Sequence, residues 1–344
     1  MSERLRILHA IRSDGFAGVE QFVLRLARAQ QQRGDEVTVI GGATEPMRAG
    51  LDPVGVGHVP AARTDDVTRA VRRLARDVDV VNTHMTAADL GTVLALAPRR
   101  TRPSVVATRH FAKPRGRIGP VPLASVVRRG IDAQIAISTA VAATIDGTST
   151  VVHPGIDARS APDTRSRERT VLIGQRLEPE KHTHVGLRAF AASGLVDDGW
   201  SLEIAGDGSE REALTALSAS LGVEAAVRFL GFRSDLPELM GRAALLVAPC
   251  PVEGFGLSLL EAMASGLPVV AAAAAGHLDT LSGLDPRALY APDDVAEAAA
   301  HLRSLAGDEP GRAALAHAAL ERQRREFSLE AQADGTDAVY RSVL

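Results

Sequence analysis

The chain is poor in residue types on which several protein classes depend. Its 344 residues include one cysteine, Cys250, which excludes an intramolecular disulfide and a cysteine-based zinc site. Aromatic residues make up only 3% of the chain, and this argues against a surface that stacks nucleic-acid bases. No apolar run approaches the roughly 18 residues that span a bilayer, and charged residues within 1–10 argue against a secretory leader. A cytoplasmic protein is therefore expected.

Lysine is scarce too, because only Lys113 and Lys181 occur among the 39 basic residues. Residues 1–157 hold 21 basic and 15 acidic residues, whereas residues 158–344 hold 18 and 27. The arginine excess lies between Arg63 and Arg129. Two interpretations stay open: solvated helix faces, or a surface for an anionic partner such as a phosphorylated acceptor or an anionic lipid. The second would bring the protein to the inner membrane surface. Nucleic acid is not expected as a partner.

Short β-branched runs alternate with amphipathic segments in two series. In the first series we expect strands at 5–11, 36–40, 79–82, 104–108, 133–137 and 150–153, with helices near 19–33, 67–76 and 86–97. In the second we expect strands at 170–174, 201–206, 226–231, 244–249 and 268–272, with helices at 181–193, 209–221, 256–265, 293–306 and 309–326. Such runs predict parallel sheets covered on both faces.

The polar segment 157–169 separates the two series and is interpreted as a linker. We therefore expect an α/β protein with two doubly wound, Rossmann-like domains that face each other across a cleft. The first would span 1–157 and bind the acceptor. The second would span 158–326 and bind the nucleotide sugar. Residues 327–344 would form a C-terminal helix that packs back on the first domain.

The most informative segment is EGFGLSLLE, in which Glu253 and Glu261 bracket a turn that opens into a helix. The start of a helix offers free backbone N–H groups to an anion. Carboxylates in so apolar a region are costly without partners. Two carboxylates on either side of an anion site suit a nucleotide sugar, which has a ribose, a diphosphate and a sugar in that order.

Arg176 and Lys181 lie in the loop after the first strand of the second series, at the edge of the sheet where ligands bind. Arginine can hold a phosphate with two hydrogen bonds, and lysine adds a mobile charge. The alternative is a pair of surface residues that form ion pairs with Glu178 and Glu180. Taken alone the two interpretations are balanced, but together with the Glu253 and Glu261 pair the functional interpretation is favoured.

Two glycine turns also follow strands. The turn at Gly206 and Gly208 lacks the third glycine of a dinucleotide fingerprint, and turn chemistry explains both glycines. Gly206 is kept as a donor-binding candidate, with any ligand contact secondary. Gly18 lies at the start of the first helix, where a glycine lets the backbone approach a ligand. Asp77 and Asp79 resemble a metal pair, but Asp77 is expected to end a helix, Asp79 is expected to start a strand, and nothing nearby supplies further ligands. We therefore expect no metal there.

Histidines end two strands of the first series, namely His84 and His110. A single histidine is more often structural than catalytic, but two at the ligand-binding edge favour a role for at least one. Arg109 precedes His110, and a loop beginning at Lys113 follows it. His84, Arg109 and Lys113 are therefore candidates for the acceptor site.

Taken together, these motifs resemble a retaining glycosyltransferase of the GT-B fold, in family 4 (glycosyl transferases group 1). The likeness covers nearly the whole chain. The glutamate signature in its EGFG and EAMASGLPVV context is specific. The weaker motifs, which occur in the expected order, are AGVE (17–20), VVATRH (105–110), ISTAV (137–141), HPGID (153–157), RLEPEK (176–181) and GDG (206–208).

The resemblance implies a role for each site residue. Glu261 would hold the ribose and Glu253 the donor sugar, while Arg176 and Lys181 would neutralise the diphosphate. Backbone N–H groups would meet the sugar or β-phosphate, and the base would lie beside a second segment. His110 would lie near the anomeric carbon and acceptor. The backbone N–H groups that meet the sugar or β-phosphate would be those of Phe255, Gly256 and Leu257. The segment beside the base would be Gly231, Phe232 and Arg233. Gly18 would approach the diphosphate.

The sequence departs from the family pattern at several positions. Ala17 occupies one position of a usual glycine pair, and His182 occupies the position of the glycine that commonly follows the lysine. Asp279 stands in place of a glutamate, and Ala275-Gly276 replaces a Gly-Gly pair. These departures bear on the donor sugar and not on the diphosphate site.

The sequence therefore predicts an enzyme that moves a sugar from a UDP- or GDP-sugar to a hydroxyl acceptor, with retention of configuration and without a metal or cofactor. The acceptor could be lipid-linked, a glycan or a small molecule. Two alternatives remain: a nucleotide-sugar epimerase of the same fold, or a non-catalytic nucleotide-binding protein. A nicotinamide oxidoreductase is disfavoured, because neither half opens on the dinucleotide fingerprint.

Overall fold

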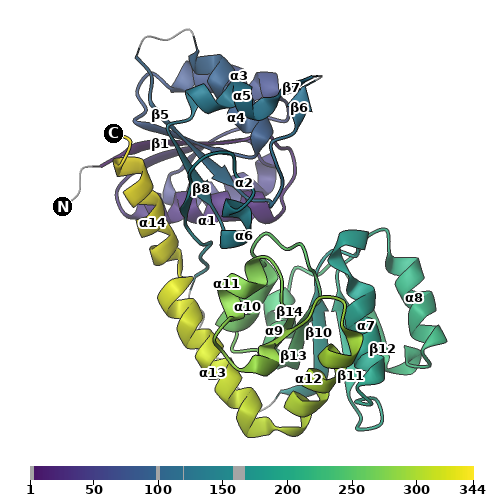
Figure 1. Cartoon of the computed structure of the whole chain (residues 1–344). Coiled ribbons are helices and arrows are strands. Elements are labelled where there is room, and N and C mark those ends of the chain that lie inside the picture. Colours follow the sequence, from purple (N-terminus) through teal and green to yellow (C-terminus); the bar gives the residue numbers. More distant parts are fainter. Residues whose placement is uncertain (1–3, 98–100, 119, 158–166) are drawn as a thin grey trace. The chain divides into compact units, whose positions relative to one another are not determined.

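The computed structural model describes residues 4–97, 101–118, 120–157 and 167–344. It divides the chain into two compact units (Figure 1). The first unit contains residues 1–155 together with 329–344, and the second contains 156–328. The last helix, α14 (Leu329–Arg341), therefore belongs to the first unit, although it follows the second unit in sequence.

A seven-stranded parallel sheet forms the centre of the first unit, in the order β3-β2-β1-β4-β5-β8-β9. Its strands are β1 (Arg6–Ile11), β2 (Glu36–Ile40), β3 (Gly57–Val59), β4 (Val80–His84), β5 (Ser104–Arg109), β8 (Ala133–Ala136) and β9 (Thr150–Val151). Its other helices are α1 (Gly18–Gln32), α2 (Thr44–Leu51), α3 (Thr64–Leu74), α4 (Thr86–Leu96), α5 (Leu123–Val127) and α6 (Thr139–Ala142). A small antiparallel pair, β6 (Arg117–Ile118) and β7 (Val121–Pro122), precedes α5.

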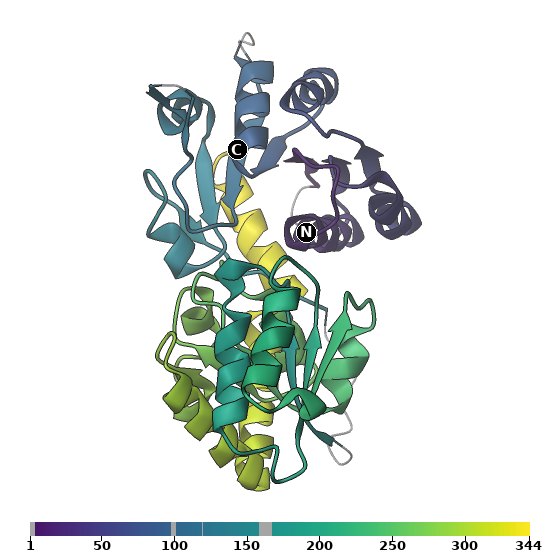
Figure 2. The same cartoon turned by 90° about the vertical axis from the view of Figure 1, so that its right-hand side faces the viewer.

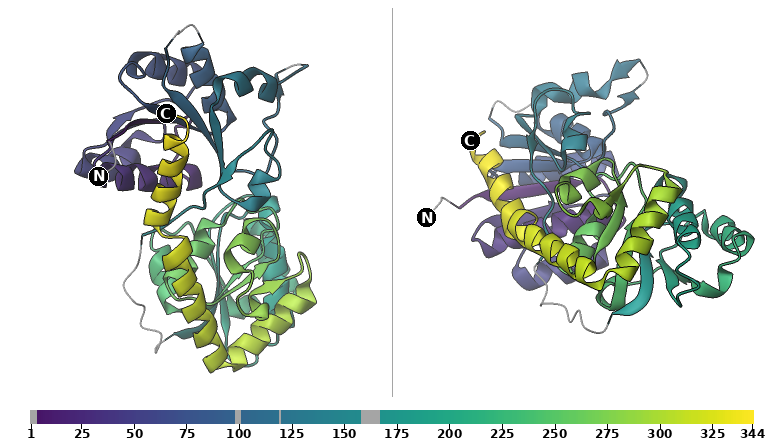
Figure 3. Two further views of the ribbon diagram at one scale, coloured as in Figure 1. Left: turned by 60° about the vertical axis from the view of Figure 1, so that its left-hand side comes forward. Right: turned by 60° about the horizontal axis from the view of Figure 1, so that its bottom comes forward.

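The two faces of this sheet differ in polarity. One face is apolar: Leu8, Ala10, Val81 and Val105 are buried in one cluster with residues of α3 and α4. The opposite face carries a polar row that includes His9, Asn82 and Thr108, all with 0–1% exposure. This face lies against α1 and α14, which pack beside each other (Figures 1 and 3). A central sheet of this class is usually apolar on both faces, so the polar row requires an explanation.

The second unit contains a six-stranded parallel sheet in the order β12-β11-β10-β13-β14-β15. The strands and helices of this unit form the lower part of Figure 2. Its strands are β10 (Glu168–Gly174), β11 (Ser201–Ala205), β12 (Val227–Gly231), β13 (Ala243–Ala248), β14 (Val269–Ala272) and β15 (Leu289–Tyr290). Its helices are α7 (Thr183–Ala192), α8 (Arg211–Ser220), α9 (Leu236–Arg242), α10 (Leu257–Ala264), α11 (Gly276–Leu281), α12 (Val295–Gly307) and α13 (Glu309–Glu326). In both units the strand order starts centrally and reverses, which is the Rossmann-like arrangement.

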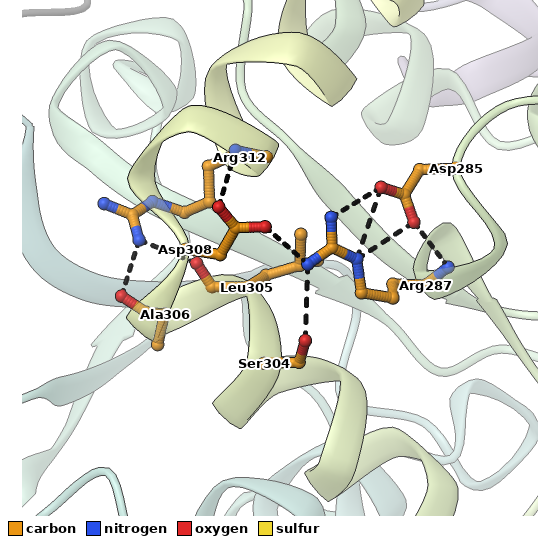
Figure 4. Close-up of polar contacts among 8 residues, drawn as sticks. Asp285, Arg287, Ser304, Leu305, Ala306, Asp308 and Arg312 are labelled. Carbon is orange, nitrogen blue, oxygen red and sulfur yellow. Dashed lines mark hydrogen bonds and ion pairs between the residues drawn. The ribbon is translucent and has the colours of Figure 1, made fainter.

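An arginine clamp joins the end of α12 to the start of α13 (Figure 4). Arg287 donates to Asp285 at 2.7 Å and to Asp308 at 2.9 Å. Asp308 is the N-cap of α13, and its side chain accepts from the Gly311 N–H group. Arg312 donates to the carbonyls of Leu305 and Ala306, which lie in the last turn of α12. Hydrogen bonds from Arg287 hold the pKa of Asp308 below its usual range. The helix ends are thus satisfied by side chains.

The secondary structure differs from the prediction mainly in short elements. The sequence patterns did not indicate the short elements, which show no clear period. These are α2, α5, α6, α9, α11, β3, β6, β7 and β15. The predicted linker falls largely on residues 158–166, outside the described part of the chain. Its predicted end at Arg169 is wrong, because β10 begins at Glu168. Just before it, Arg167 donates to four backbone carbonyls, those of Met240, Ala243, Ser265 and Gly266.

The structural interpretation of the Asp77 and Asp79 pair is supported. Asp79 accepts from the Arg6 backbone N–H at 2.8 Å and from its guanidinium at 2.8 Å. These hydrogen bonds lower the pKa of Asp79. Within the described ranges, no three His, Cys, Asp or Glu side chains gather as a metal site would require.

Much of the arginine excess of the first unit is paired within that unit. Arg69 contacts Asp66 at 2.5 Å, and Arg102 contacts Asp132 at 2.6 Å. Arg115 and Asp89 form an ion pair at 3.0 Å with side-chain exposures of 1% and 0%. For these arginines the structural interpretation holds. No helix in the described part of the chain has the length and apolar character of a membrane span.

Candidate active site

The candidate site of the second unit lies where two neighbouring strands end. β10 and β13 pair in parallel, so the loops that follow Gly174 and Ala248 leave the same edge of the sheet. The first loop contains Arg176 and Lys181, and the second contains Glu253. Ligands of doubly wound sheets bind at this edge.

Lys181 and Glu253 are brought together across 72 positions of sequence. The Lys181 Nζ atom lies 2.5 Å from Glu253 Oε2, and the two side chains are 16% and 25% exposed. The alternative in which Lys181 pairs with a glutamate of its own loop is therefore not realised. A half-buried ion pair at a sheet edge leaves each group able to exchange its partner for a ligand, because neither is fully withdrawn from solvent.

Arg176 is placed differently. Its side chain is 66% exposed and donates to Glu180 at 3.1 Å. The surface-pair alternative is thus realised for Arg176, which in this structure does not join the Lys181–Glu253 pair. A pair this exposed contributes little stability, so breaking it to contact an anion would cost little.

The turn before α10 depends on two glycines. Gly256, the N-cap of α10, has a φ of 94°, a conformation that other residues rarely adopt. Gly276 begins α11, and a Cβ atom there would lie 2.3 Å from the Cα atom of Phe255. The Gly276 N–H donates to the Glu253 carbonyl at 3.1 Å. The start of α11 therefore packs against the EGFG turn and fixes it.

The predicted backbone donors lie in this turn. Phe255 is 2% exposed, and its ring packs edge-on against Phe327 at 5.4 Å. Leu257 is the first residue of α10, where helix geometry provides no internal acceptor for the N–H groups. Glu261 lies one turn further along α10 and is half-buried. Its carbonyl accepts from Ser265 Oγ at 2.7 Å.

His277, which the sequence analysis missed, belongs to the same site. It is 2% exposed, and its Nδ1 donates to the Ala272 carbonyl at 3.0 Å. The Nε2 atom is therefore an acceptor, and it lies beside Gly256. Burial lowers the pKa of His277, with the charge of Glu253 acting in the opposite direction. Its position in AGHLD, in the loop-to-helix segment shortly after β14, was the signal that could have revealed it.

Other donor-site predictions lie along the neighbouring loops. Gly206 donates to the Gly231 carbonyl at 2.8 Å, and a Cβ at Gly206 would lie 1.8 Å from the Gln175 carbonyl oxygen. Close backbone approach therefore explains this glycine, as turn chemistry predicted. Phe232, which follows β12, is 84% exposed. Arg233 pairs with Asp235 at 2.5 Å.

His182 has a left-handed backbone, with a φ of 49°. This conformation explains why a glycine would be usual after Lys181. The His182 Nδ1 atom lies 2.7 Å from Asp293 Oδ1, and Asp293 also has a positive φ, 64°. Two residues with strained backbones, His182 and Asp293, thus contact each other next to the loop that carries Lys181.

In the first unit the predicted residues also lie at the carboxyl ends of strands. Gly18 is exposed and begins α1. His110 follows β5 and is 6% exposed, with its Nε2 atom 3.0 Å from Nδ1 of His84. His84 is fully buried, at 0% exposure. Its prediction as an acceptor-contacting residue is corrected, because the side chain lies behind His110.

Arg109 and Lys113 are also placed differently from each other. Arg109 is 5% exposed and donates to the Lys113 carbonyl at 2.8 Å, so it holds the loop that follows β5. Burial lowers the pKa of Arg109, and the charge of Arg115 acts in the same direction. The Lys113 side chain is exposed and stays a candidate for the acceptor site.

Two family models match the chain in succession. The Glycosyltransferase Family 4 model matches residues 16–160, and the Glycosyl transferases group 1 model matches residues 157–322. The chain belongs to the group 1 glycosyltransferases. The two matches meet close to the boundary between the two units. The Glycosyl transferases group 1 match includes the turn at Glu253.

Curated relatives of this family differ in how much of their length is matched. The glycogen synthase of Mycobacterium tuberculosis is 34% identical over 197 residues, which is 56% of this chain but 48% of that protein. The chain thus spans about half the length of that relative. The lipopolysaccharide core biosynthesis mannosyltransferase LpcC of Rhizobium leguminosarum is 26% identical over 347 residues, covering 95% of this glycosyltransferase and 94% of LpcC.

Solved structures show the same fold. HepE of Anabaena, in a complex with UDP and glucose, superposes with a TM-score of 0.81 at 21% identity, covering 99% of this chain and 100% of that one. A glycosyltransferase from Rickettsia africae gives a TM-score of 0.80 at 17% identity, with 99% of each chain covered. The glycosyltransferase therefore has the predicted GT-B fold of two Rossmann-like domains.

Proposed function

We propose that this family member transfers a sugar from a nucleoside diphosphate sugar to a hydroxyl acceptor. The Lys181–Glu253 pair supports this function most directly, because it places a cation and a carboxylate at the N-terminus of α10. A diphosphate needs fixed positive groups, and a sugar offers hydroxyls to a carboxylate. HepE, which has the same fold, binds UDP-glucose in its crystal structure.

In the proposed reaction the bond from the anomeric carbon to the β-phosphate oxygen breaks, and negative charge grows on the diphosphate. Lys181, the exposed Arg176 and the N–H groups at Gly256 and Leu257 stabilise that charge. Glu261 holds the ribose and Glu253 the sugar. Retention of configuration and independence of metal are part of the proposal. The roles of Gly18, Phe232 and Arg233 stay predictions.

Substitution of the two cations tests the assignment. Lys181→Ala removes a charge from a half-buried pair, so turnover should fall by roughly tens to thousands of fold, the equivalent of about 2–5 kcal/mol. Arg176→Ala should lower turnover less, because its side chain is more exposed. Circular dichroism and the melting temperature should stay near those of the wild type. Full activity of both variants would refute the assignment.

The donor is identified by ligand-induced stabilisation. UDP, GDP and their glucose and mannose derivatives are tested one at a time. The true donor should raise the melting temperature, with a stabilisation that grows as the logarithm of its concentration above Kd. Calorimetry on Lys181→Ala should show weaker binding of the same nucleotide. A folded protein that binds no nucleoside diphosphate would contradict the proposed function.

Two further measurements separate the remaining alternatives. Incubation with donor alone, followed by sugar analysis, would reveal an epimer if the protein were an epimerase. A non-catalytic protein would bind the nucleotide without releasing it from the donor.

Turnover should persist in EDTA if no metal is needed. Loss of activity in EDTA, with recovery on addition of Mg²⁺, would contradict the metal-independent step.

A further inference from the structure

Three histidines form a continuous row inside the first unit. His9 Nε2 lies 2.7 Å from Gln30 Oε1, and His9 Nδ1 lies 3.0 Å from His84 Nε2. His84 Nδ1 then lies 3.0 Å from His110 Nε2. The side chains of Gln30, His9 and His84 are 0–2% exposed, and His110 is 6% exposed. The row thus runs from the buried side of α1 to the edge of the sheet.

Strand register produces this row. His84 is two residues beyond Asn82, the partner of His9 on β4. His110 is in turn two residues beyond Thr108, the partner of His84 on β5. Side chains two positions apart share a face of a strand. Each histidine therefore lies one step nearer the carboxyl edge than the one before it.

The row is neutral and ordered. Burial lowers the pKa of His9 to about 4 and that of His110 to about 3, the latter with help from Arg109, and it lowers the pKa of His84 well below its usual range. The Phe22 ring packs edge-on against His110 at 4.8 Å and His84 at 5.9 Å. No carboxylate touches these three rings in the described part of the chain.

In this structure Gln30 presents its Oε1 atom to His9, while its Nε2 atom has no hydrogen-bond partner among the described residues. This orientation of Gln30 sets the direction of every hydrogen bond in the row. A neutral imidazole has one donor and one acceptor nitrogen. Because Gln30 Oε1 accepts, His9 carries its proton on Nε2 and accepts on Nδ1. The same logic then applies to His84 and to His110. His110 is left with an unprotonated Nδ1, the one ring nitrogen of the row that has no partner among the described residues.

We propose that Gln30, His9 and His84 are positioning residues that hold His110 in its Nε2–H tautomer and present its Nδ1 lone pair to the attacking hydroxyl of the acceptor. This inference rests on the proposed transfer reaction. His110 accepts a hydrogen bond from that hydroxyl and orients its oxygen. It is too weak a base to remove the proton at neutral pH, so the proton leaves with the diphosphate.

A purely structural row would fill the same space but would not need one tautomer. The first experiment therefore reads the tautomers directly. Two-bond ¹H–¹⁵N correlation spectra of the histidine-labelled wild-type protein at pH 7.5 distinguish protonated from bare ring nitrogens. We expect Nε2–H for His9, His84 and His110. A protonated Nδ1 on His110, or a mixture of tautomers, would overturn the proposal whatever the activity.

The second experiment separates orientation from binding. The His84→Leu variant breaks the row, whereas His84→Gln can accept from His110 through Oε1 and donate to His9 through its amide. UDP or GDP release from the donor found by the stabilisation screen is measured with water as acceptor. We expect kcat to fall about tenfold in His84→Leu, the loss of one oriented hydrogen bond. KM for the donor should be unchanged, and His84→Gln should recover most of the rate.

His58→Leu is the matched control. His58 lies in the same unit, is only half-buried, and bonds to the Gly41 carbonyl at 3.0 Å, outside the row. Its kcat should equal that of the wild type. Equal kcat in His84→Leu and wild type would overturn the proposal, as would a change confined to donor KM. If the proposed function is wrong, the protein will not bind the nucleotide. The tautomer spectra do not depend on nucleotide binding, so they still test the arrangement of the histidine row.

Discussion

The residues after β14 show how one backbone position can fix a site. Ala275 has a φ of 47° and a ψ of −131°, a combination that glycine adopts far more readily. Next to it, Gly276 packs directly on the backbone of Phe255. The family pattern has two glycines here, and this chain has alanine at position 275 and glycine at position 276. Only the second position is sterically closed.

These two positions make opposite predictions. Ala275→Gly should stabilise the protein by about 1 kcal/mol, because it relieves a strained conformation. Gly276→Ala should destabilise it by about 1–3 kcal/mol, because the new methyl group meets backbone atoms that cannot move aside. Urea unfolding measures both. Nucleotide affinity should also fall in Gly276→Ala alone. A Gly276→Ala variant as stable as the wild type would show that the turn is more adaptable than this packing implies.

At the scale of elements, α14 completes the first unit through a polar contact. The Tyr340 hydroxyl accepts from the Asn82 side-chain amide at 2.6 Å, and Asn82 in turn accepts from Thr108 at 2.8 Å. Arg33 of α1 contacts Asp334 at 2.6 Å. The last helix is thus held to β4 and α1 by interactions that no local sequence pattern reveals.

Removal of one hydroxyl tests this attachment. Tyr340→Phe should lower the free energy of unfolding by about 1–3 kcal/mol, because it leaves a buried amide donor without a partner. Tyr290→Phe is the control. Tyr290 is 1% exposed, and its hydroxyl has no hydrogen-bond partner in the described ranges. That substitution should be neutral or slightly stabilising. Equal losses in both variants would mean that the Asn82 contact contributes nothing specific.

For the whole molecule, buried neutral histidines link stability to pH. The pKa of His9 is lowered from 6.5 to about 4, and that of His110 to about 3. His84 and His277 shift in the same direction through burial. Above pH 6.5 the folded and unfolded chains hold these groups in the same neutral form. Below it the unfolded chain takes up protons that the folded chain excludes.

Stability should therefore fall as the pH drops from 6.5 towards 4. Each such histidine contributes a slope of up to about 1.4 kcal/mol per pH unit. Urea unfolding at pH 7.5, 6.5, 5.5 and 5.0 measures the slope above the range in which carboxylates titrate. His84→Leu should have a shallower slope than the wild type, and His58→Leu should resemble the wild type more closely. A flat profile between pH 6.5 and 5.0 would contradict the burial of neutral histidines.

The longer elements could be predicted from the sequence because their signals are local. Strand β1 and helix α1 start within one residue of their predicted positions. The grouping of the site motifs could also be predicted, because the carboxyl ends of parallel strands lie at one edge of the sheet and the motifs follow those strands. By contrast, α9 and α11 are too short for a periodic signal, and their positions follow from packing.

The sequence by itself determined the parallel-sheet class, the family and the presence of Glu253, Lys181 and His110 at strand ends, since each depends on residues near one another in the chain. Only the tertiary structure decided which partners these residues have. It joined Lys181 to Glu253, left Arg176 with Glu180, and aligned His9, His84 and His110 in one row. The physical reason is that strand register and loop packing set these contacts, and both depend on segments far apart in sequence.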